Sequence, residues 1–101
     1  MKAIEILRYK LELQHRDSKR VGIFEFVVWD VGKSSSYPDG IKYRAWLTEN
    51  GETVLGFDNH KPKGPHIHFG EREVSYEYKG LEQLQVDMKR LIELEGYIYE
   101  S

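Results

Sequence analysis

The chain has 101 residues, of which 40% are hydrophobic and 32% charged, and its net charge is −2. This composition suits a single folded domain and excludes a globally basic nucleic-acid-binding protein. The absence of cysteine excludes disulfides, thiolate metal sites and cysteine nucleophiles. No signal-peptide hydrophobic region follows the start, and no apolar run approaches the roughly 20 residues of a membrane span. We therefore expect one domain over residues 1–101, located in the cytoplasm, with no membrane contact.

The first half of the chain shows strand patterns separated by polar turns. Apolar and polar residues alternate over residues 7–14, which predicts a half-buried strand. A polar turn follows over residues 15–19. The run Val21–Trp29 is β-branched and aromatic on both faces, which predicts a central strand covered on both sides. The small, polar composition of residues 32–40 predicts a mobile loop.

An Asn50-Gly51 turn between two strand-like runs, 41–48 and 53–58, predicts a β-hairpin. The pairs that this turn predicts are Leu47 with Val54, Ala45 with Gly56, Tyr43 with Asp58, Trp46 with Leu55, and Arg44 with Phe57. In this register, Tyr43 and Asp58 meet at the end of the hairpin where the histidine-rich loop begins.

The last third predicts a further strand and a helix. Residues 73–79 alternate as a fifth strand, and from Leu81 the apolar period becomes helical until Gly96. The predicted apolar stripe of the helix consists of Leu81, Leu84, Met88, Leu91 and Ile92. The fold class is therefore α+β: an antiparallel sheet of four to five strands, in a meander of hairpins, with one long C-terminal helix packed on one face.

The predicted helix is too short to cover both faces of such a sheet. The uncovered face would carry Trp46, Leu55 and Phe57. We therefore expect a second protein surface against it, supplied either by a homodimer mate or by a different partner. The alternative is that the loops and the C-terminal tail cover this face.

The stretch over residues 57–70 is the candidate functional loop. His66 and His68 are two residues apart, so in a strand both project from one face. Two such imidazoles suit an acid/base pair, a metal pair or a phosphate site, while a structural role is the alternative. Asp58 is the candidate for an orienting carboxylate or a third metal ligand, and His60 and Glu71 are the other candidates for that ligand.

Basic and polar residues near the histidines are candidates for substrate binding. From residue 60 to residue 68 the chain carries two lysines and three histidines but no acid. This local excess suits a phosphate backbone, although a solvated turn is the alternative for a lysine pair. The predicted substrate-binding residues are Lys61, Lys63, Arg44, Tyr43 and Asn59. For Arg44 and the strand tyrosines, a structural role is the competing interpretation.

Several short pieces, spread over nearly the whole chain, match the pattern of one known family. They are Val27-Val28-Trp29, Lys42-Tyr43-Arg44, Gly56-Phe57-Asp58-Asn59, Lys63-Gly64-Pro65-His66-Ile67-His68, Glu73, Tyr76, Tyr78, Leu84 and Asp87. In these pieces the chain resembles the TumE-type toxins of bacterial and archaeal toxin–antitoxin operons. The family pattern often has an acid where this chain has Pro65, so the role of that acid is either vacant or taken by Asp58.

The resemblance implies a small cytoplasmic toxin that a helix-turn-helix antitoxin binds and silences. RNA cleavage is the usual expectation for toxins of this size. The first hypothesis is a metal-independent endoribonuclease with His66 and His68 as its acid/base pair and no cofactor. The second is a metal-dependent nuclease or phosphoesterase in which Asp58, His66 and His68 hold a divalent ion. The third is a non-enzymatic binding module, and the fourth is a structural domain whose histidines only fasten the loop.

Overall fold

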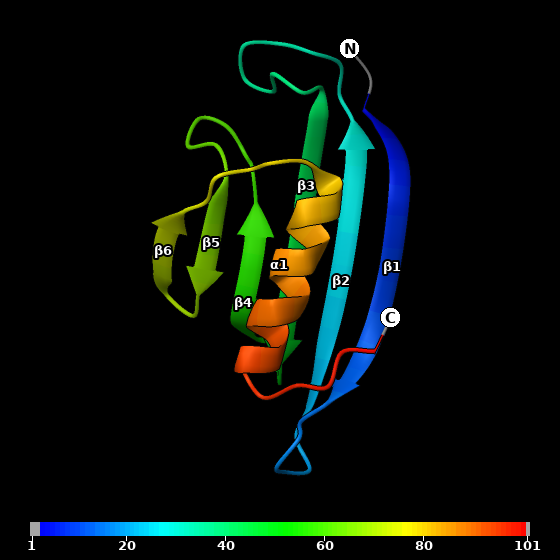
Figure 1. Cartoon of the computed structure of the whole chain (residues 1–101), viewed down its shortest axis with the longest axis vertical. Helices are drawn as coiled ribbons and strands as arrows, with labels where there is room; N and C mark the ends of the chain where they lie inside the picture. Colours follow the sequence, from blue (N-terminus) through cyan, green and yellow to red (C-terminus); the bar gives the residue numbers. More distant parts are fainter. Residues whose placement is uncertain (1–2, 101) are drawn as a thin grey trace.

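A computed structural model describes residues 3–100; residues 1–2 and 101 of the predicted domain lie outside the described residues. Six strands form one antiparallel sheet, in which each strand pairs with the next along the chain (Figure 1). The elements are β1 (Ile4–Gln14), β2 (Val21–Asp30), β3 (Ile41–Glu49), β4 (Glu52–Asp58), β5 (His66–Phe69), β6 (Arg72–Ser75) and α1 (Leu81–Leu94). The predicted α+β class is confirmed, with one strand more than the expected four to five.

The additional strand is β5, which lies inside the expected functional loop and is followed by a tight turn. Gly70 has a φ of +61°, in the left-handed region that glycine adopts without strain. Gly70 and Glu71 therefore reverse the chain, and Phe69 pairs directly with Arg72. The strand expected over residues 73–79 is thus a short β6, followed by an extended segment that leads to the helix.

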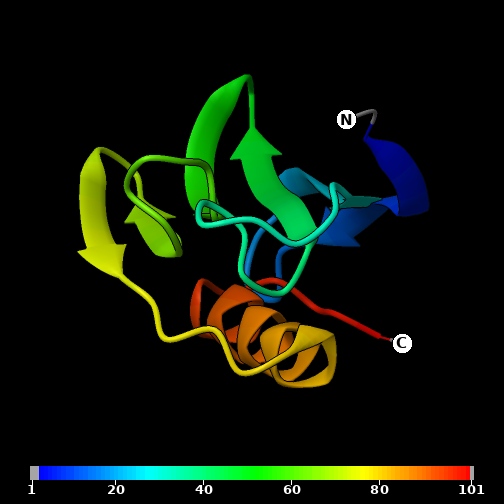
Figure 2. The ribbon, with the colours of Figure 1, turned by 90° about the horizontal axis from the view of Figure 1, so that it is seen from above.

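The helix covers one face of the sheet, which we call the helix face (Figure 1 and Figure 2). Leu84, Met88 and Ile92 of α1 are fully buried, as the apolar stripe predicts. The sheet contributes to this core the buried side chains of Leu13, Phe24, Phe26, Val28, Tyr43, Ala45, Leu47, Leu55, Phe57 and Ile67. Each large apolar side chain buried here contributes about 1.5–3 kcal/mol to folding. This face therefore stabilises the fold.

The C-terminal tail packs on the same face as the helix (Figure 2). Tyr97 and Tyr99 are both buried, and the Ile98 amide donates to the carbonyl of Gln14 at 2.9 Å. The hydroxyl groups of Tyr99 and Tyr9 are 2.9 Å apart. The tail therefore does not cover the other face of the sheet.

The β3–β4 hairpin forms at the predicted turn but in a different register. Asn50 and Gly51 both have positive φ, and Glu49 pairs with Glu52 as predicted. A bulge at Val54 then shifts the pairing by one residue. The observed pairs are Leu47 with Leu55, Trp46 with Gly56, Ala45 with Phe57 and Arg44 with Asp58, so the predicted pairs beyond the turn are wrong.

This shift has a physical reason, because it places the apolar residues of β4 in the core. Leu55 and Phe57 are each 1% exposed under the helix. Both were expected on the uncovered face, and that prediction is wrong. Trp46 does lie on the face away from the helix, which we call the open face. With two of its three expected side chains buried elsewhere, the open face no longer requires a protein partner to cover apolar surface.

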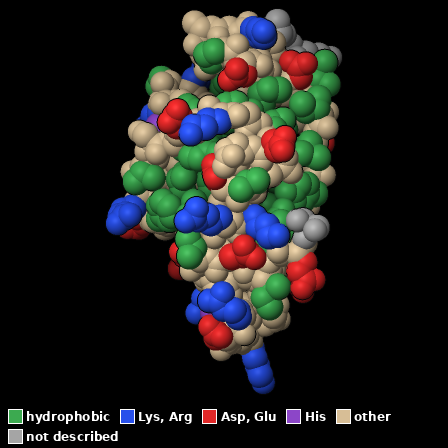
Figure 3. Space-filling model, viewed as in Figure 1, with side chains coloured by type: hydrophobic (Ala, Val, Ile, Leu, Met, Phe, Trp, Pro, Cys, Tyr) green, Lys and Arg blue, Asp and Glu red, His purple; other side chains and the backbone are tan. Residues whose placement is uncertain are grey.

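The sequence predicts that β2 is buried on both faces, and this prediction is correct for the helix face only. On the open face, Val27 is buried but Ile23 and Trp29 are partly exposed. On the helix side of the molecule, charged side chains are interspersed with hydrophobic ones (Figure 3). Within the described residues, no helix is long and apolar enough to cross a membrane.

Candidate functional site

A hollow of about 530 Å³ lies on the open face, where the loop after β4 meets β3 and β5. Its lining residues are Trp29, Lys42, Tyr43, Arg44, Asp58, His60, Lys61, Pro62, Lys63, His66, His68 and Glu73. We call it the histidine cavity. It brings together most of the predicted site residues, which come from segments far apart in the sequence.

The sheet register places the site residues in two rows that run across the strands. In the first row, Arg44 pairs with Asp58, and Asp58 pairs with His66. In the second row, His68 lies between Gly56 of β4 and Glu73 of β6. Cross-strand partners lie on the same face of a sheet. Both histidines therefore project from the open face, as their spacing predicts.

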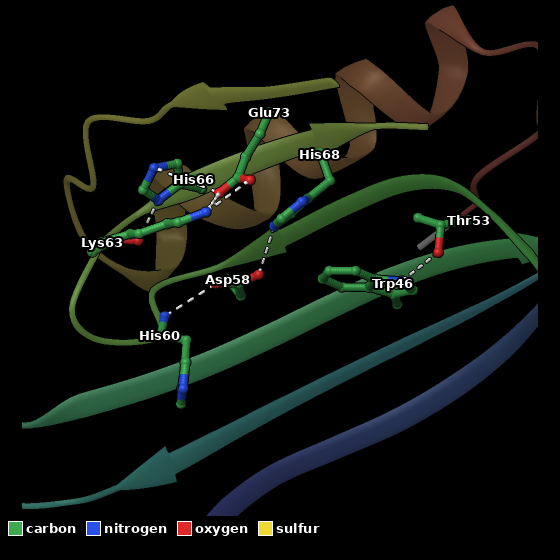
Figure 4. Close-up of polar contacts among 9 residues, drawn as sticks. Trp46, Thr53, Asp58, His60, Lys63, His66, His68 and Glu73 are labelled. Carbon is green, nitrogen blue, oxygen red and sulfur yellow. Dashed lines mark hydrogen bonds and ion pairs between the residues drawn. The ribbon is translucent and has the colours of Figure 1, made fainter. Parts of the chain in front are cut away.

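Asp58 holds His68 in one orientation. The carboxylate oxygen Oδ2 lies 2.8 Å from Nε2 of His68 (Figure 4). The other oxygen, Oδ1, accepts the backbone N–H of His60 at 3.1 Å. Because a carboxylate only accepts hydrogen bonds, Nε2 of His68 carries the proton. The ring therefore presents Nδ1 as its second nitrogen. The ring of His60 points away from the carboxylate (Figure 4).

His66 has the opposite tautomer. Its Nδ1 lies 2.7 Å from the carbonyl oxygen of Gly64. A carbonyl only accepts hydrogen bonds, so Nδ1 is the donor and Nε2 of the neutral ring keeps its lone pair. This Nε2 is 3.8 Å from Oε1 of Glu73, which is beyond hydrogen-bonding distance. The two imidazoles thus differ in which nitrogen forms a hydrogen bond with the protein: Nε2 in His68 and Nδ1 in His66.

Glu73 is a site residue that the analysis of the sequence did not select. Nζ of Lys63 lies 3.1 Å from both of its carboxylate oxygens. The hydrogen bond from the Lys63 ammonium lowers the pKa of Glu73 below its ordinary value. Its signal in the sequence was the Gly70-Glu71 turn, which brings residue 73 opposite residue 68.

Trp46 forms a flat platform beside the histidines. A Cβ at Gly56 would lie 2.8–2.9 Å from the ring atoms of Trp46, so the indole rests directly on the glycine backbone. Nε1 of Trp46 donates to Oγ1 of Thr53 at 2.8 Å (Figure 4). The ring centroids of Trp46 and His68 are 5.0 Å apart. The guanidinium carbon of Arg44 lies 4.8 Å from the indole centroid. Gly56 is therefore required for the position of this platform.

A second cation–indole pair lies on the same face. Nζ of Lys42 is 5.7 Å from the centroid of the Trp29 ring, and the two residues are cross-strand partners. Neither residue was selected from the sequence, although Trp29 and Lys42 both lie in pieces that resemble the family. The signal for Lys42 was its position on the polar side of its strand, beside Arg44, whereas Trp29 had no such signal because its strand is apolar on both faces.

Two predicted substrate-binding residues have other contacts. The Asn59 side chain is buried and accepts the Tyr43 amide at 2.9 Å while donating to the carbonyl of Ile41 at 2.8 Å. It fastens the functional loop to β3 and does not line the histidine cavity. Tyr43 contributes to the cavity wall, but its ring is fully buried and stacks on Tyr78 at 5.3 Å. Burial also raises the pKa of its hydroxyl.

The remaining predicted residues, Lys61, Lys63 and Arg44, do line the cavity. Between residues 3 and 100, no group of three or more His, Cys, Asp or Glu side chains is arranged to hold a metal ion. Asp58 and His68 are not arranged as metal ligands because they bond to each other, and Nδ1 of His66 bonds to the carbonyl of Gly64.

Comparison with known proteins connects this site with a family. The family model described as Toxin TumE matches residues 2–95, which is nearly the whole chain. Neither the curated proteins nor the solved structures contain a match. The matched range includes both rows of the site and the helix that supports them. The chain therefore belongs to the TumE toxin family, as its resemblance predicts, and is the toxin component of a toxin–antitoxin system.

Proposed function

We propose that this toxin is an endoribonuclease that cleaves RNA by transesterification. The observation that carries the proposal is the Asp58–His68 pair, with Oδ2 and Nε2 2.8 Å apart, beside a second histidine in one cavity. Lysine and arginine side chains from two segments, β3 and the loop between β4 and β5, also line this cavity. Two histidines and nearby cations are the groups that general acid–base cleavage of a phosphodiester requires.

The proposed step transfers two protons. The general base removes the proton of a ribose 2′-hydroxyl, and the 2′-oxygen forms a bond to the adjacent phosphorus. The bond from phosphorus to the 5′-oxygen breaks, and the general acid gives a proton to that oxygen. The products are a 2′,3′-cyclic phosphate and a free 5′-hydroxyl, so no water or co-reactant is consumed in this step.

The two tautomers support different roles for the histidines. Oδ2 of Asp58 lies 2.8 Å from Nε2 of His68, so the carboxylate fixes the ring and leaves Nδ1 as the nitrogen that can carry a transferable proton. His68 is therefore the general acid, with the proton on Nδ1 available to the leaving oxygen. His66 is the general base, because its bond to Gly64 commits Nδ1 and leaves the lone pair of Nε2 free.

Arg44 is the best candidate to stabilise the charge on the phosphate. Lys63 was the other candidate, but its ammonium is paired with both oxygens of Glu73. Arg44 lies over an indole and forms no ion pair with a carboxylate within residues 3–100. Arg44 is also the cross-strand partner of Asp58, which in turn pairs with His66. Lys61 borders the same cavity and adds positive charge.

The direct test compares RNA cleavage by wild type, His66→Ala and His68→Ala in the presence of EDTA. Loss of a general acid or base lowers the rate roughly 10²–10⁴-fold. The matched control is His15→Ala, because His15 packs on Tyr97 far from the cavity and affects stability instead. The proposal is wrong if the folded histidine variants cleave as fast as wild type. Activity that EDTA abolishes would support the metal-dependent hypothesis with Asp58, His66 and His68.

We also propose that the antitoxin partner is a helix-turn-helix protein and that both act in the cytoplasm. The family membership supports an antitoxin partner, and the resemblance supports its type. A homodimer across the open face has less support, because Leu55 and Phe57 are buried under the helix. Co-expression with the neighbouring gene product and size-exclusion chromatography would test this proposal. Elution of the toxin alone, as a monomer, would contradict the stable complex.

A further inference from the structure

A second hollow lies beside the histidine cavity on the open face. Its volume is about 320 Å³. Its lining includes Arg8, Lys10, Glu25, Trp29, Arg44 and Trp46. Trp29 and Arg44 line both hollows, so the two are adjacent. Together they form a continuous track from β5 across the sheet to β1.

The track carries cations next to aromatic rings. Arg44 lies over Trp46 at 4.8 Å and Lys42 over Trp29 at 5.7 Å. For residues 3–100, no carboxylate forms an ion pair with Arg44, Lys42 or Lys10. These three positive charges are therefore available to a ligand, in a chain whose net charge is −2.

The one acidic residue that lines the second hollow is already paired. Glu25 accepts from the guanidinium of Arg8 at 3.1 Å, and Arg8 also bonds Glu5 at 2.9 Å. With two carboxylates against one guanidinium, this network keeps one negative charge, which is fewer than the three positive charges of Lys10, Lys42 and Arg44. The remaining surface is cationic, apolar and aromatic. This chemistry suits a phosphate backbone whose bases are free to contact an indole.

We propose that the open face binds a single-stranded segment of RNA, with the scissile phosphate in the histidine cavity and an adjacent nucleotide in the second hollow. The base of that nucleotide contacts Trp29 or Trp46, and Arg44 lies between the two nucleotide positions. A duplex is disfavoured, because its stacked bases cannot reach an indole on a sheet face. This assignment of the substrate class rests on the proposed endoribonuclease function.

The two tryptophans provide the readout. The chain contains two, and both lie on the track, so intrinsic tryptophan fluorescence reports directly on it. The experiment titrates the protein with a 2′-O-methyl oligoribonucleotide, which cannot be cleaved because its 2′-oxygen is blocked. We expect quenching by the single strand and much weaker quenching by the same sequence as a duplex. Trp29→Phe and Trp46→Phe assign the signal to one or both indoles.

A charge-reversal pair tests the second hollow separately from the catalytic residues. Lys10 borders this hollow, whereas Lys79 is an exposed lysine in the segment before α1. Lys10→Glu is expected to weaken binding several-fold and to reduce the salt dependence by about 0.7 per lost phosphate contact. Lys79→Glu is the matched control and is expected to bind as wild type does.

The outcomes separate this inference from the proposed reaction. Quenching by the inert oligonucleotide, without cleavage of natural RNA, would support the RNA track and contradict the catalytic proposal. Cleavage of natural RNA, with no quenching and equal binding by Lys10→Glu and Lys79→Glu, would overturn the track and leave the reaction standing. Equal quenching by single strand and duplex would overturn the single-strand assignment. If the antitoxin quenches the tryptophans and RNA does not, the open face is a protein interface and the inference is wrong.

Discussion

The two faces of the sheet differ in what their side chains do. On the helix face, Phe26, Tyr43 and Leu84 are 0% exposed, and their contacts are with other core residues. On the open face, His66, His68, Asp58 and Trp46 are partly exposed, and His68 bonds to Asp58 and packs beside the Trp46 ring. One face therefore supplies most of the stability and the other supplies the candidate chemistry.

A single strand serves both faces because its side chains alternate. In β4, Leu55 and Phe57 are buried under the helix, while Gly56 and Asp58 face the opposite side. The core residues and the site residues of β4 share one backbone, so packing of the core fixes the position of the site. Substitutions on one face are expected to change stability and those on the other to change activity, which makes the comparison testable.

The largest expected effect is that of Asp58→Asn on activity. The amide no longer offers His68 a charged acceptor that fixes its ring and tautomer, so the cleavage rate is expected to fall roughly 10²–10⁴-fold. An amide oxygen can still accept the His60 N–H, so the folded state is retained. The measurement is the cleavage rate, with circular dichroism as the check on folding. An unchanged rate would mean that Asp58 has only a structural role.

The next effect is on stability, with Leu84→Ala. This side chain is fully buried, so its truncation is expected to lower the free energy of unfolding by about 2–5 kcal/mol. Val86→Ala is the control, because Val86 is 56% exposed on the same helix and is expected to change stability by less than about 0.5 kcal/mol. Urea denaturation measures both. Lower activity of the folded Leu84 variant, per folded molecule, would contradict the division between the two faces.

Gly56→Ala should affect both stability and activity, because the Trp46 indole rests on Gly56. The added Cβ would lie 2.8 Å from the Trp46 ring, so the indole must move, at a cost of about 1–3 kcal/mol. The fluorescence of Trp46 and the cleavage rate are expected to change together. The double variant Gly56→Ala/Trp46→Ala tests the cause. If Gly56→Ala lowers stability as much in the Trp46→Ala background as in wild type, the contact with the indole is not the cause of the loss.

The smallest effect concerns Glu73 and pH. Its pKa is lowered from the ordinary 4.5 in the folded protein, chiefly by the Lys63 hydrogen bond. This contribution to stability is present above pH 4.5 and is lost as the pH falls through the lowered value. Glu73→Gln should therefore lower the melting temperature slightly at pH 7, and the difference should shrink as the pH falls below 4.5. Glu71→Gln, in the adjoining turn, is the matched control. A difference that persists at low pH would exclude the ion pair as its cause.

The sequence was sufficient for the strand and helix patterns but not for the β3–β4 register. An Asn50-Gly51 turn fixes only the first pairs, and a bulge beyond it reverses the faces of all later residues. The apolar pattern held the missing information. Without a shift, Phe57 faces Arg44, whereas the bulge aligns it with Ala45 in the core. A pairing chosen to bury the most apolar surface would have predicted the bulge.

The candidate site was predictable in part for the same reason. The spacing of His66 and His68 placed both on one face, and proximity in sequence suggested Asp58. Glu73 and Trp29 come from strands whose neighbours depend on turns and register, so their approach to the histidines requires the assembled sheet. The engagement of Asn59 with the backbone of β3 is likewise a tertiary contact that composition does not reveal.

The central claim is that the open face cleaves RNA through its two histidines, and the ends of the reaction products test it most directly. Purified wild type and His68→Ala would be incubated with a defined RNA in EDTA, beside the same sequence as DNA. The account predicts 2′,3′-cyclic phosphate and 5′-hydroxyl ends from RNA with wild type, none from DNA, and loss of cleavage in the variant. Intact RNA with the wild type, or products with 5′-phosphate ends, would contradict it.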